Sequence, residues 1–184
     1  MPVELNTMDL DQNKIFLILS QPGKMRERNM EIIRIISGLG FHTLVVTTNF
    51  PYSVLKKLYE QNGIALSKVT FIDAVTRNSI GSVENIPGEV RYVNSPANLT
   101  DMGIAVTSAL KDLSGKKVCI LYDSISTMLI YLSSQNISKF IHFVTTKLRL
   151  LDLSGIFLAA EKGIDPQLQS QLATFVDTVI DIPD

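Results

Sequence analysis

The stretch KIFLILSQPGKMRERNMEII, residues 14–33, passes from an unbroken apolar run through a short turn into a helical pattern. An apolar run without alternation is typical of a strand that is buried on both faces of a sheet. Met30, Ile33 and Ile36 follow at helical spacing, and the glycines of GLG, residues 38–40, predict where the helix ends. The stretch predicts a strand, a turn and a helix, which together form the repeating unit of a parallel α/β sheet.

The same alternation of short apolar runs and helical patterns continues along nearly the whole chain. We predict strands at residues 14–20, 42–48, 69–72, 117–122, 155–160 and 174–180. Parallel strands that are joined by right-handed helical crossovers place helices on both faces of the sheet. The predicted fold class is therefore α/β, a three-layer αβα sandwich around a mostly parallel sheet.

One segment, residues 74–98, breaks this rhythm. It has no helical period and contains two glycines and two prolines. Because the segment is too long for an ordinary turn, we predict an irregular excursion with a short extra strand near EVRYV, residues 89–93.

The composition favours a single domain over residues 1–184, with its core at about residues 14–182. A chain of 184 residues with 46% hydrophobic content buries one sizeable core. The net charge of −1 lacks the positive field of proteins that bind duplex nucleic acid, so nucleic acid is not expected as a main partner. The single cysteine excludes a disulfide within the chain, and no apolar run reaches the roughly 18 residues of a membrane span. We expect a cytoplasmic protein without a membrane partner.

Gly23 and Lys24 occupy the place of a phosphate-binding loop, shortly after the first predicted strand. The Walker A pattern G-x-x-x-x-G-K-[ST] uses glycines for backbone approach, the lysine for the outer phosphates and a hydroxyl for magnesium. Aligned on Gly23 and Lys24, this chain has Ile18 at the first glycine and Met25 at the hydroxyl. A branched side chain prevents the tight turn, and a thioether is a poor magnesium ligand. The residues fit two interpretations, an ordinary strand-to-helix turn and an unconventional nucleotide loop.

Asp123 and Ser124 follow an apolar run in KKVCILYDSISTMLIY, residues 116–131. An acidic residue at the carboxyl end of a buried strand has the form of a Walker B element, which orients magnesium and its waters. Aspartate and serine are also preferred helix caps. We therefore favour the interpretation that Asp123 caps the following helix over a Walker B role.

The order of these motifs resembles the RecA-like ATPases of the KaiC type, which are abundant in archaea. The Walker B strand of that family typically ends in an aspartate-serine pair, as at Asp123 and Ser124 here. Residues 148–161, LRLLDLSGIFLAAE, and residues 176–180, VDTVI, resemble two further patterns of the family. The resemblance covers roughly residues 14–182 and implies a RecA-like P-loop topology, with ATP and Mg²⁺ as the cofactors of an active member.

The chain departs from this family at the residues that carry catalysis. Members have an intact Walker A motif, which Ile18 and Met25 interrupt here. They also have a glutamate just past the second strand that activates the attacking water, and Asn49 stands at that place in this chain. An amide cannot take a proton from water at neutral pH. The resemblance therefore implies a degenerate member that lacks an intact Walker A motif and does not hydrolyse ATP by the usual mechanism.

These features favour a non-catalytic regulatory or protein-interaction module, which binds protein partners or itself and needs no cofactor. The first alternative is an ATP-binding protein or weak ATPase with an unconventional phosphate loop. In that case Gly23, Lys24, Asp123 and Ser124 are expected to hold the nucleotide, and Asp123 also holds the magnesium ion. The second alternative is an accessory protein for single-stranded nucleic acid, although the sequence has no basic stripe interleaved with aromatic residues.

Overall fold

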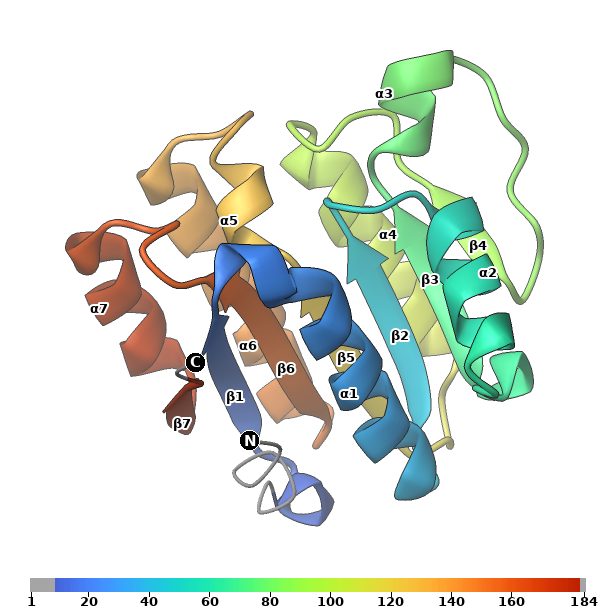
Figure 1. Ribbon diagram of the computed structural model, residues 1–184, viewed down its shortest axis with the longest axis horizontal. Coiled ribbons are helices and arrows are strands. Elements are labelled where there is room, and N and C mark those ends of the chain that lie inside the picture. Colours follow the sequence, from blue (N-terminus) through green and yellow to red (C-terminus); the bar gives the residue numbers. More distant parts are fainter. Residues whose placement is uncertain (1–8, 183–184) are drawn as a thin grey trace.

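The computed structural model describes residues 9–182, which form a single seven-stranded sheet with helices on both faces (Figure 1). The strand order is β4-β3-β2-β5-β6-β1-β7, and every neighbouring pair is parallel. The strands are β1 (Ile15–Ser20), β2 (His42–Thr47), β3 (Val69–Asp73), β4 (Val90–Tyr92), β5 (Val118–Asp123), β6 (Ser154–Ala160) and β7 (Thr178–Asp181). The parallel sheet confirms the predicted α/β class.

The helices divide into two layers, one on each face of the sheet (Figure 1). One face is covered by α1 (Met25–Gly38) and α2 (Tyr52–Gln61), and the other by α4 (Leu99–Asp112), α5 (Ile125–Met128), α6 (Ser134–Leu150) and α7 (Pro166–Phe175). Short 3₁₀ turns lie at η2 (Leu10–Gln12), η3 (Pro22–Lys24) and η4 (Leu66–Lys68). This arrangement is the predicted three-layer sandwich.

Two apolar cores fill the spaces between the sheet and the helix layers. Alternate residues of one strand point into different cores: Leu17 and Leu19 face α4 to α7, whereas Phe16 and Ile18 face α1 and α2. This two-sided burial explains why the strand sequences are continuously apolar.

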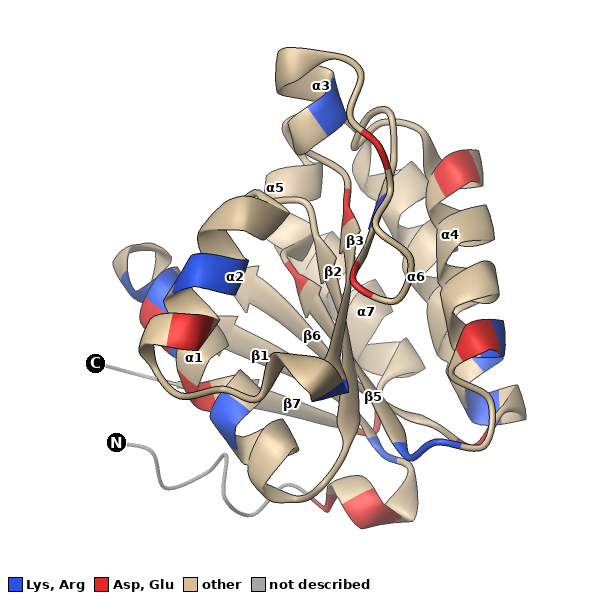
Figure 2. Ribbon diagram, turned by 90° about the vertical axis from the view of Figure 1, so that its right-hand side faces the viewer, with Lys and Arg blue, Asp and Glu red and all other residues tan. Residues whose placement is uncertain are grey.

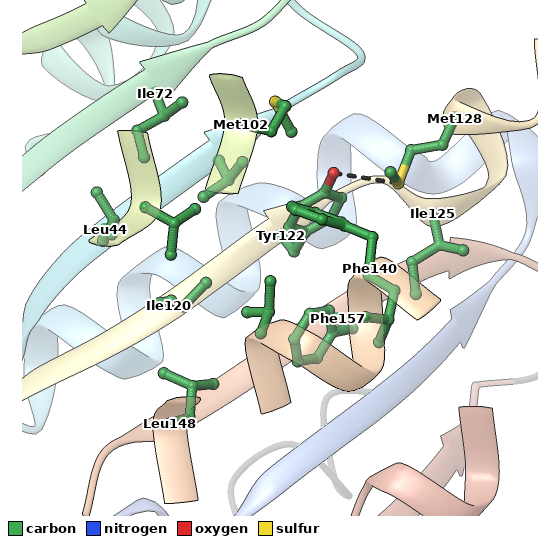
Figure 3. Packing of buried hydrophobic residues seen from close by; sticks show 14 of the residues in the cluster. Leu44, Ile72, Met102, Ile120, Tyr122, Ile125, Met128, Phe140, Leu148 and Phe157 are labelled. Carbon is green, nitrogen blue, oxygen red and sulfur yellow. Dashed lines mark hydrogen bonds between the residues drawn. The ribbon is translucent and has the colours of Figure 1, made fainter. Parts of the chain in front are cut away.

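Figure 3 shows the core on the α4 to α7 side, with Tyr122 of β5 at its centre. The ring of Tyr122 stacks on Phe157 with centroids 5.8 Å apart, and its hydroxyl donates to the sulfur of Met128 at 3.1 Å. The only polar atom of this large side chain therefore has a partner inside the core.

Five of the six predicted strands agree with the structure to within one residue at each end. The sixth, predicted at residues 174–180, begins too early, because α7 continues to Phe175. The Asp165 carboxylate accepts from the Leu168 amide at 2.9 Å, and Pro166 occupies the first turn, so the segment starts as a well-capped helix. The buried stripe of α7, Leu168 and Leu172, then holds it against the sheet.

The excursion at residues 74–98 contains the predicted short strand, β4, and also a helix that the prediction lacked, α3 (Thr76–Ile80). The helix starts on Asp73, whose carboxylate accepts from the backbone amides of Val75 and Thr76 at 2.8 Å. Arg77 then donates to the carbonyl oxygens of Val83 and Tyr92. These contacts order a five-residue helix that is too short to show a sequence period.

Candidate functional site

The sequence-predicted site residues lie at the carboxyl ends of strands β1 and β5, at the edge of the sheet where open α/β folds bind ligands. Gly23 and Lys24 follow β1, Asn49 follows β2, and Asp123 is the last residue of β5. Strand β6 lies between β1 and β5, so the Gly23 turn and Asp123 are not on adjacent strands. Helix α1 bridges this gap, because its residues contact both ends.

Only four residues, 21 to 24, connect β1 to α1. Three of them form the 3₁₀ turn η3, and the Lys24 amide donates to the Gln21 carbonyl at 3.0 Å. The Lys24 ammonium forms an ion pair with Glu27 at 2.9 Å, and both side chains are exposed. A Cβ at Gly23 would meet no atom within 4 Å, and Gly23 has no positive φ. Glycine is thus not required at this position by space or by backbone conformation.

Ile18, at the place of the first Walker A glycine, lies in the middle of the sheet. It is fully buried in β1 and is paired with Leu158 of β6 on one side and with Ile180 of β7 on the other. Three of the eight residues that would wrap a phosphate chain, 18 to 20, are therefore strand, and their backbone amides belong to the sheet.

Asp123 is fully buried, and both of its carboxylate oxygens accept hydrogen bonds from side-chain amides. Oδ2 accepts from Asn29 of α1 at 2.8 Å, and Oδ1 accepts from Asn49 at 3.3 Å. Burial raises the pKa of the Asp123 carboxyl to about 6, because it disfavours the charged form, and the two amide hydrogen bonds oppose this rise. Among residues 9–182 no cation forms an ion pair with Asp123.

The Asp123 site extends to α2 through Asn29. The Asn29 amide oxygen accepts from the Tyr59 hydroxyl at 2.6 Å, and both side chains are fully buried. Burial raises the pKa of the Tyr59 hydroxyl, and the charge of Asp123 raises it further. The chain of hydrogen bonds Tyr59, Asn29, Asp123 and Asn49 thus connects α2, α1, β5 and the end of β2. We call these four residues the Asp123 network.

Sequence reasoning missed Asn29, although a signal for it exists. Asn29 lies on the buried stripe of α1, between the apolar residues Met25 and Ile33. An amide on an otherwise apolar helix face needs a buried partner, because an unpaired polar group in a core is costly. That partner is 94 residues away in the sequence.

The interpretation of Asp123 as a helix cap is wrong, because its neighbour Ser124 caps α5. The Ser124 hydroxyl accepts from the Thr127 amide at 3.3 Å, and the Thr48 hydroxyl donates to the Ser124 carbonyl at 2.9 Å. Successive residues of a strand point to opposite faces. Asp123 therefore shares the α1 face with Leu121, whereas Ser124 reaches α5 on the other face.

Within the described residues, Asp123 is not part of a metal-binding cluster of His, Cys, Asp or Glu side chains. Residues 9–182 contain no group of three or more His, Cys, Asp or Glu side chains that is arranged to hold an ion. Nor does this part of the chain contain a helix with the length and apolar character needed to cross a bilayer.

Comparison with known proteins places the chain in a family. The model of one family matches residues 38–182, which is most of the chain and includes β2, β5 and the Asp123–Ser124 pair. The chain belongs to the family of unknown function DUF7504. A search of curated proteins finds no match.

Solved structures show the same fold at low sequence identity. A KaiC-like protein from the hyperthermophilic archaeon Pyrococcus horikoshii OT3 superimposes with a TM-score of 0.66 at 15% identity, over 94% of this chain and 74% of the other. An uncharacterised protein of Pyrococcus horikoshii, solved in complex with an unknown peptide, has a TM-score of 0.65 at 14% identity, over 92% of this chain and 77% of the other. These likenesses confirm the predicted KaiC-like, RecA-like fold.

Proposed function

We propose that this protein is a non-catalytic RecA-like domain that acts as a regulatory, protein-interaction module. The observation that carries the proposal is the state of Asp123. Its carboxylate is buried, and its two oxygens are occupied by the amides of Asn29 and Asn49. A Walker B aspartate has to present an oxygen to hydrated magnesium, and in this arrangement each oxygen already accepts a hydrogen bond from a side-chain amide and lies away from solvent.

Two further observations support the absence of turnover. The turn of residues 21–24 is a closed 3₁₀ turn that follows directly on a paired strand, so it offers few backbone amides to a phosphate chain. Asn49 stands where the KaiC-type resemblance expects a glutamate base, and its amide is already a donor to Asp123.

The interaction role has support from a protein of the same fold, since the second Pyrococcus protein was solved in complex with a peptide.

Calorimetric titration with millimolar MgATP, together with a phosphate-release assay, tests the proposal. We expect no saturable heat and no phosphate release above the background of buffer. A matched pair of variants locates any signal that does occur: Lys24→Ala changes the turn, and Lys57→Ala removes an exposed lysine from α2. MgATP binding that Lys24→Ala abolishes and Lys57→Ala preserves would overturn the proposal.

A second candidate function, nucleotide binding, is favoured by one specific observation. Within the described residues 9–182 the buried Asp123 carboxylate has no cationic partner, and a buried charge without one is energetically unfavourable. A magnesium ion held with ATP would supply that cation, with Gly23, Lys24 and Ser124 near the phosphates. This binding requires the Asp123 carboxylate to turn at least one oxygen toward the magnesium ion or its waters, past the amides of Asn29 and Asn49. The same titration decides between the two candidates, because only the second predicts saturable binding that Asp123→Asn removes.

A further inference from the structure

An open groove of about 740 Å³ lies between α4 and α6, on the face of the sheet opposite to the Asp123 network. Its apolar lining includes Leu99, Ile104, Phe140 and Phe143. Ile104 is 62% exposed and Phe143 is 42% exposed, so two large apolar side chains at one groove face water. Clustered exposure of this kind marks interaction sites more often than scattered single residues do.

The groove follows a second stripe of α4, distinct from the stripe that packs on the core. Lining positions recur at three- and four-residue spacing from Leu99 to Lys111, whereas the core stripe is made by Met102 and Val106 with their neighbours. The lining stretch of α4 is about 18 Å long, at 1.5 Å of rise per residue. α6 contributes the facing wall from Asn136 to Phe143. An open apolar groove between two helices fits the apolar face of a third helix.

The charged residues that line this groove are all positive. Among the described residues, Lys111 of α4 and Lys139 of α6 are the charged ones that line the groove, and none of its lining residues is Asp or Glu. Neither lysine forms an ion pair within the described residues 9–182. The turns of α4 between Asp101 and Lys111 carry no charge (Figure 2), and α6 contains no acidic residue at all.

The ammonium group of Lys147, which is not a lining residue of the groove, lies 5.7 Å from the centroid of the Phe143 ring. The acidic residue in the first turn of α4, Asp101, accepts a hydrogen bond from Asn98 at 2.7 Å and is not part of the lining. The groove therefore combines an apolar floor with a cationic rim.

We propose that the α4–α6 groove binds an acidic amphipathic helix of a partner protein. The apolar side chains of that helix lie on Ile104 and Phe143, and its carboxylates face Lys111 and Lys139. This inference rests on the proposed function and names the class of partner that the module binds. A symmetric contact between two copies of this groove would bring lysine against lysine, so charge favours a different, acidic partner. The lining stretch of α4 is about three helical turns long, which matches the apolar face of one helix.

A labelled model peptide provides the test. The probe is a peptide of about 18 residues made of leucine and glutamate, with leucine at helical spacing, and its binding is followed by fluorescence anisotropy. One control peptide has the same composition in scrambled order, and a second has lysine in place of glutamate. We expect saturable binding of the first peptide that weakens as salt is added, and no binding of either control.

Groove variants with matched controls locate the binding site. Ile104→Ser removes apolar contact and is expected to weaken binding about tenfold, whereas Ile130→Ser, at a residue 72% exposed outside the groove, is expected to leave it unchanged. Lys139→Glu is expected to weaken binding about threefold or more, and Lys57→Glu on α2 to have no effect. Unchanged thermal unfolding of all four variants shows that they are folded.

Several results would overturn the inference. The first is that the scrambled peptide binds as tightly as the helical one, or that the helical peptide does not bind. The second is that groove and control variants lose peptide affinity to the same extent. The third is that the protein forms a dimer that Ile104→Ser dissociates. Binding to phosphatidylglycerol vesicles that the groove variants abolish, without binding of the peptide, would assign the surface to a membrane instead. MgATP titration of the same preparation is a separate measurement. Binding of MgATP would refute the proposed function, whereas a peptide that does not bind, without MgATP binding, would refute only this inference.

Discussion

Replacing Asp123 by asparagine is expected to stabilise the protein at neutral pH. The side chain keeps its shape but loses the charge that burial disfavours. Asn29 is held by the Tyr59 hydroxyl and can still donate to the oxygen of the new amide. Asn49 is half-buried and can turn its amide over, so that its oxygen accepts from the new NH₂ group. Each side-chain oxygen and nitrogen of residue 123 then keeps a hydrogen-bond partner.

The magnitude follows from the shifted pKa. Burial raises the pKa of the Asp123 carboxyl from 3.8 to about 6, a difference of about two pH units, and each unit corresponds to about 1.36 kcal/mol. Ionised Asp123 therefore lowers the free energy of unfolding at pH 7 by about 3 kcal/mol. Turning Asn49 over offsets about 1 kcal/mol of this gain. We expect Asp123→Asn to raise the free energy of unfolding by about 2 kcal/mol at pH 7.

The free energy of unfolding should depend on pH in a direction that follows from the raised pKa of Asp123. Between about pH 4 and pH 6 the folded protein holds a proton on Asp123 that the unfolded chain has released, so the contribution of Asp123 to stability falls as the pH rises through this window. Asp123→Asn lacks this titration. The difference between variant and parent in the free energy of unfolding should therefore be smallest near pH 4 and reach its full value above pH 7.

Urea unfolding followed by circular dichroism at several pH values measures both quantities. Asp73→Asn is the matched control, because Asp73 is also a fully buried carboxylate at the carboxyl end of a strand, β3, which β2 separates from β5. Its oxygens accept from the backbone amides of Tyr52, Val75 and Thr76 and from the Thr76 hydroxyl, and an amide cannot accept all four. This control should lose about 2 to 4 kcal/mol. A loss of stability in Asp123→Asn, or a gain that does not depend on pH, would show that the buried charge of Asp123 does not destabilise the folded protein.

Three other substitutions or reactions test separate parts of the structure. Gly23→Ala should leave the free energy of unfolding unchanged or raise it by up to about 1 kcal/mol, since the added Cβ meets no atom within 4 Å. A decrease in the free energy of unfolding would contradict the described turn. Tyr59→Phe should cost about 1 to 3 kcal/mol, because the Asn29 oxygen loses its donor, whereas Tyr131→Phe at an exposed residue should change stability little. Cys119 should resist a thiol reagent in the folded protein and react once urea unfolds it, because burial raises the pKa of its thiol; rapid modification of the native protein would show that β5 is open to solvent.

The strands were predictable because burial on both faces leaves a direct mark on the sequence. Runs such as residues 15–19 and 118–122 are apolar without interruption, and the structure places each between two helix layers. The start of β7 was not predictable in the same way, since residues 174 and 175 complete α7 before the strand begins. Helix α3 was missed because hydrogen bonds to Asp73, rather than an apolar period, hold its first turn.

The site was predictable in part. Asp123 and Ser124 could be placed at the end of a buried strand from sequence alone, and the departures at Ile18, Met25 and Asn49 were visible by position. Which groups meet the Asp123 carboxylate was not visible, because Asn29 and Asn49 approach it from 94 and 74 residues away. Strand alternation separates Asp123 from Ser124, which gives one the α1 face and the other the cap of α5.

The order of the strands and of the longer helices, the parallel α/β class and the residues at the strand ends can be read from the sequence, because these depend on local periodicity and on the burial of whole segments. The two amide hydrogen bonds to the Asp123 oxygens and the pairing of Ile18 on both sides follow only from how the segments meet in three dimensions. The tertiary structure also decided that a second stripe of α4 faces α6 across an open groove. Such features arise where segments far apart in the chain meet, and no local pattern encodes the meeting.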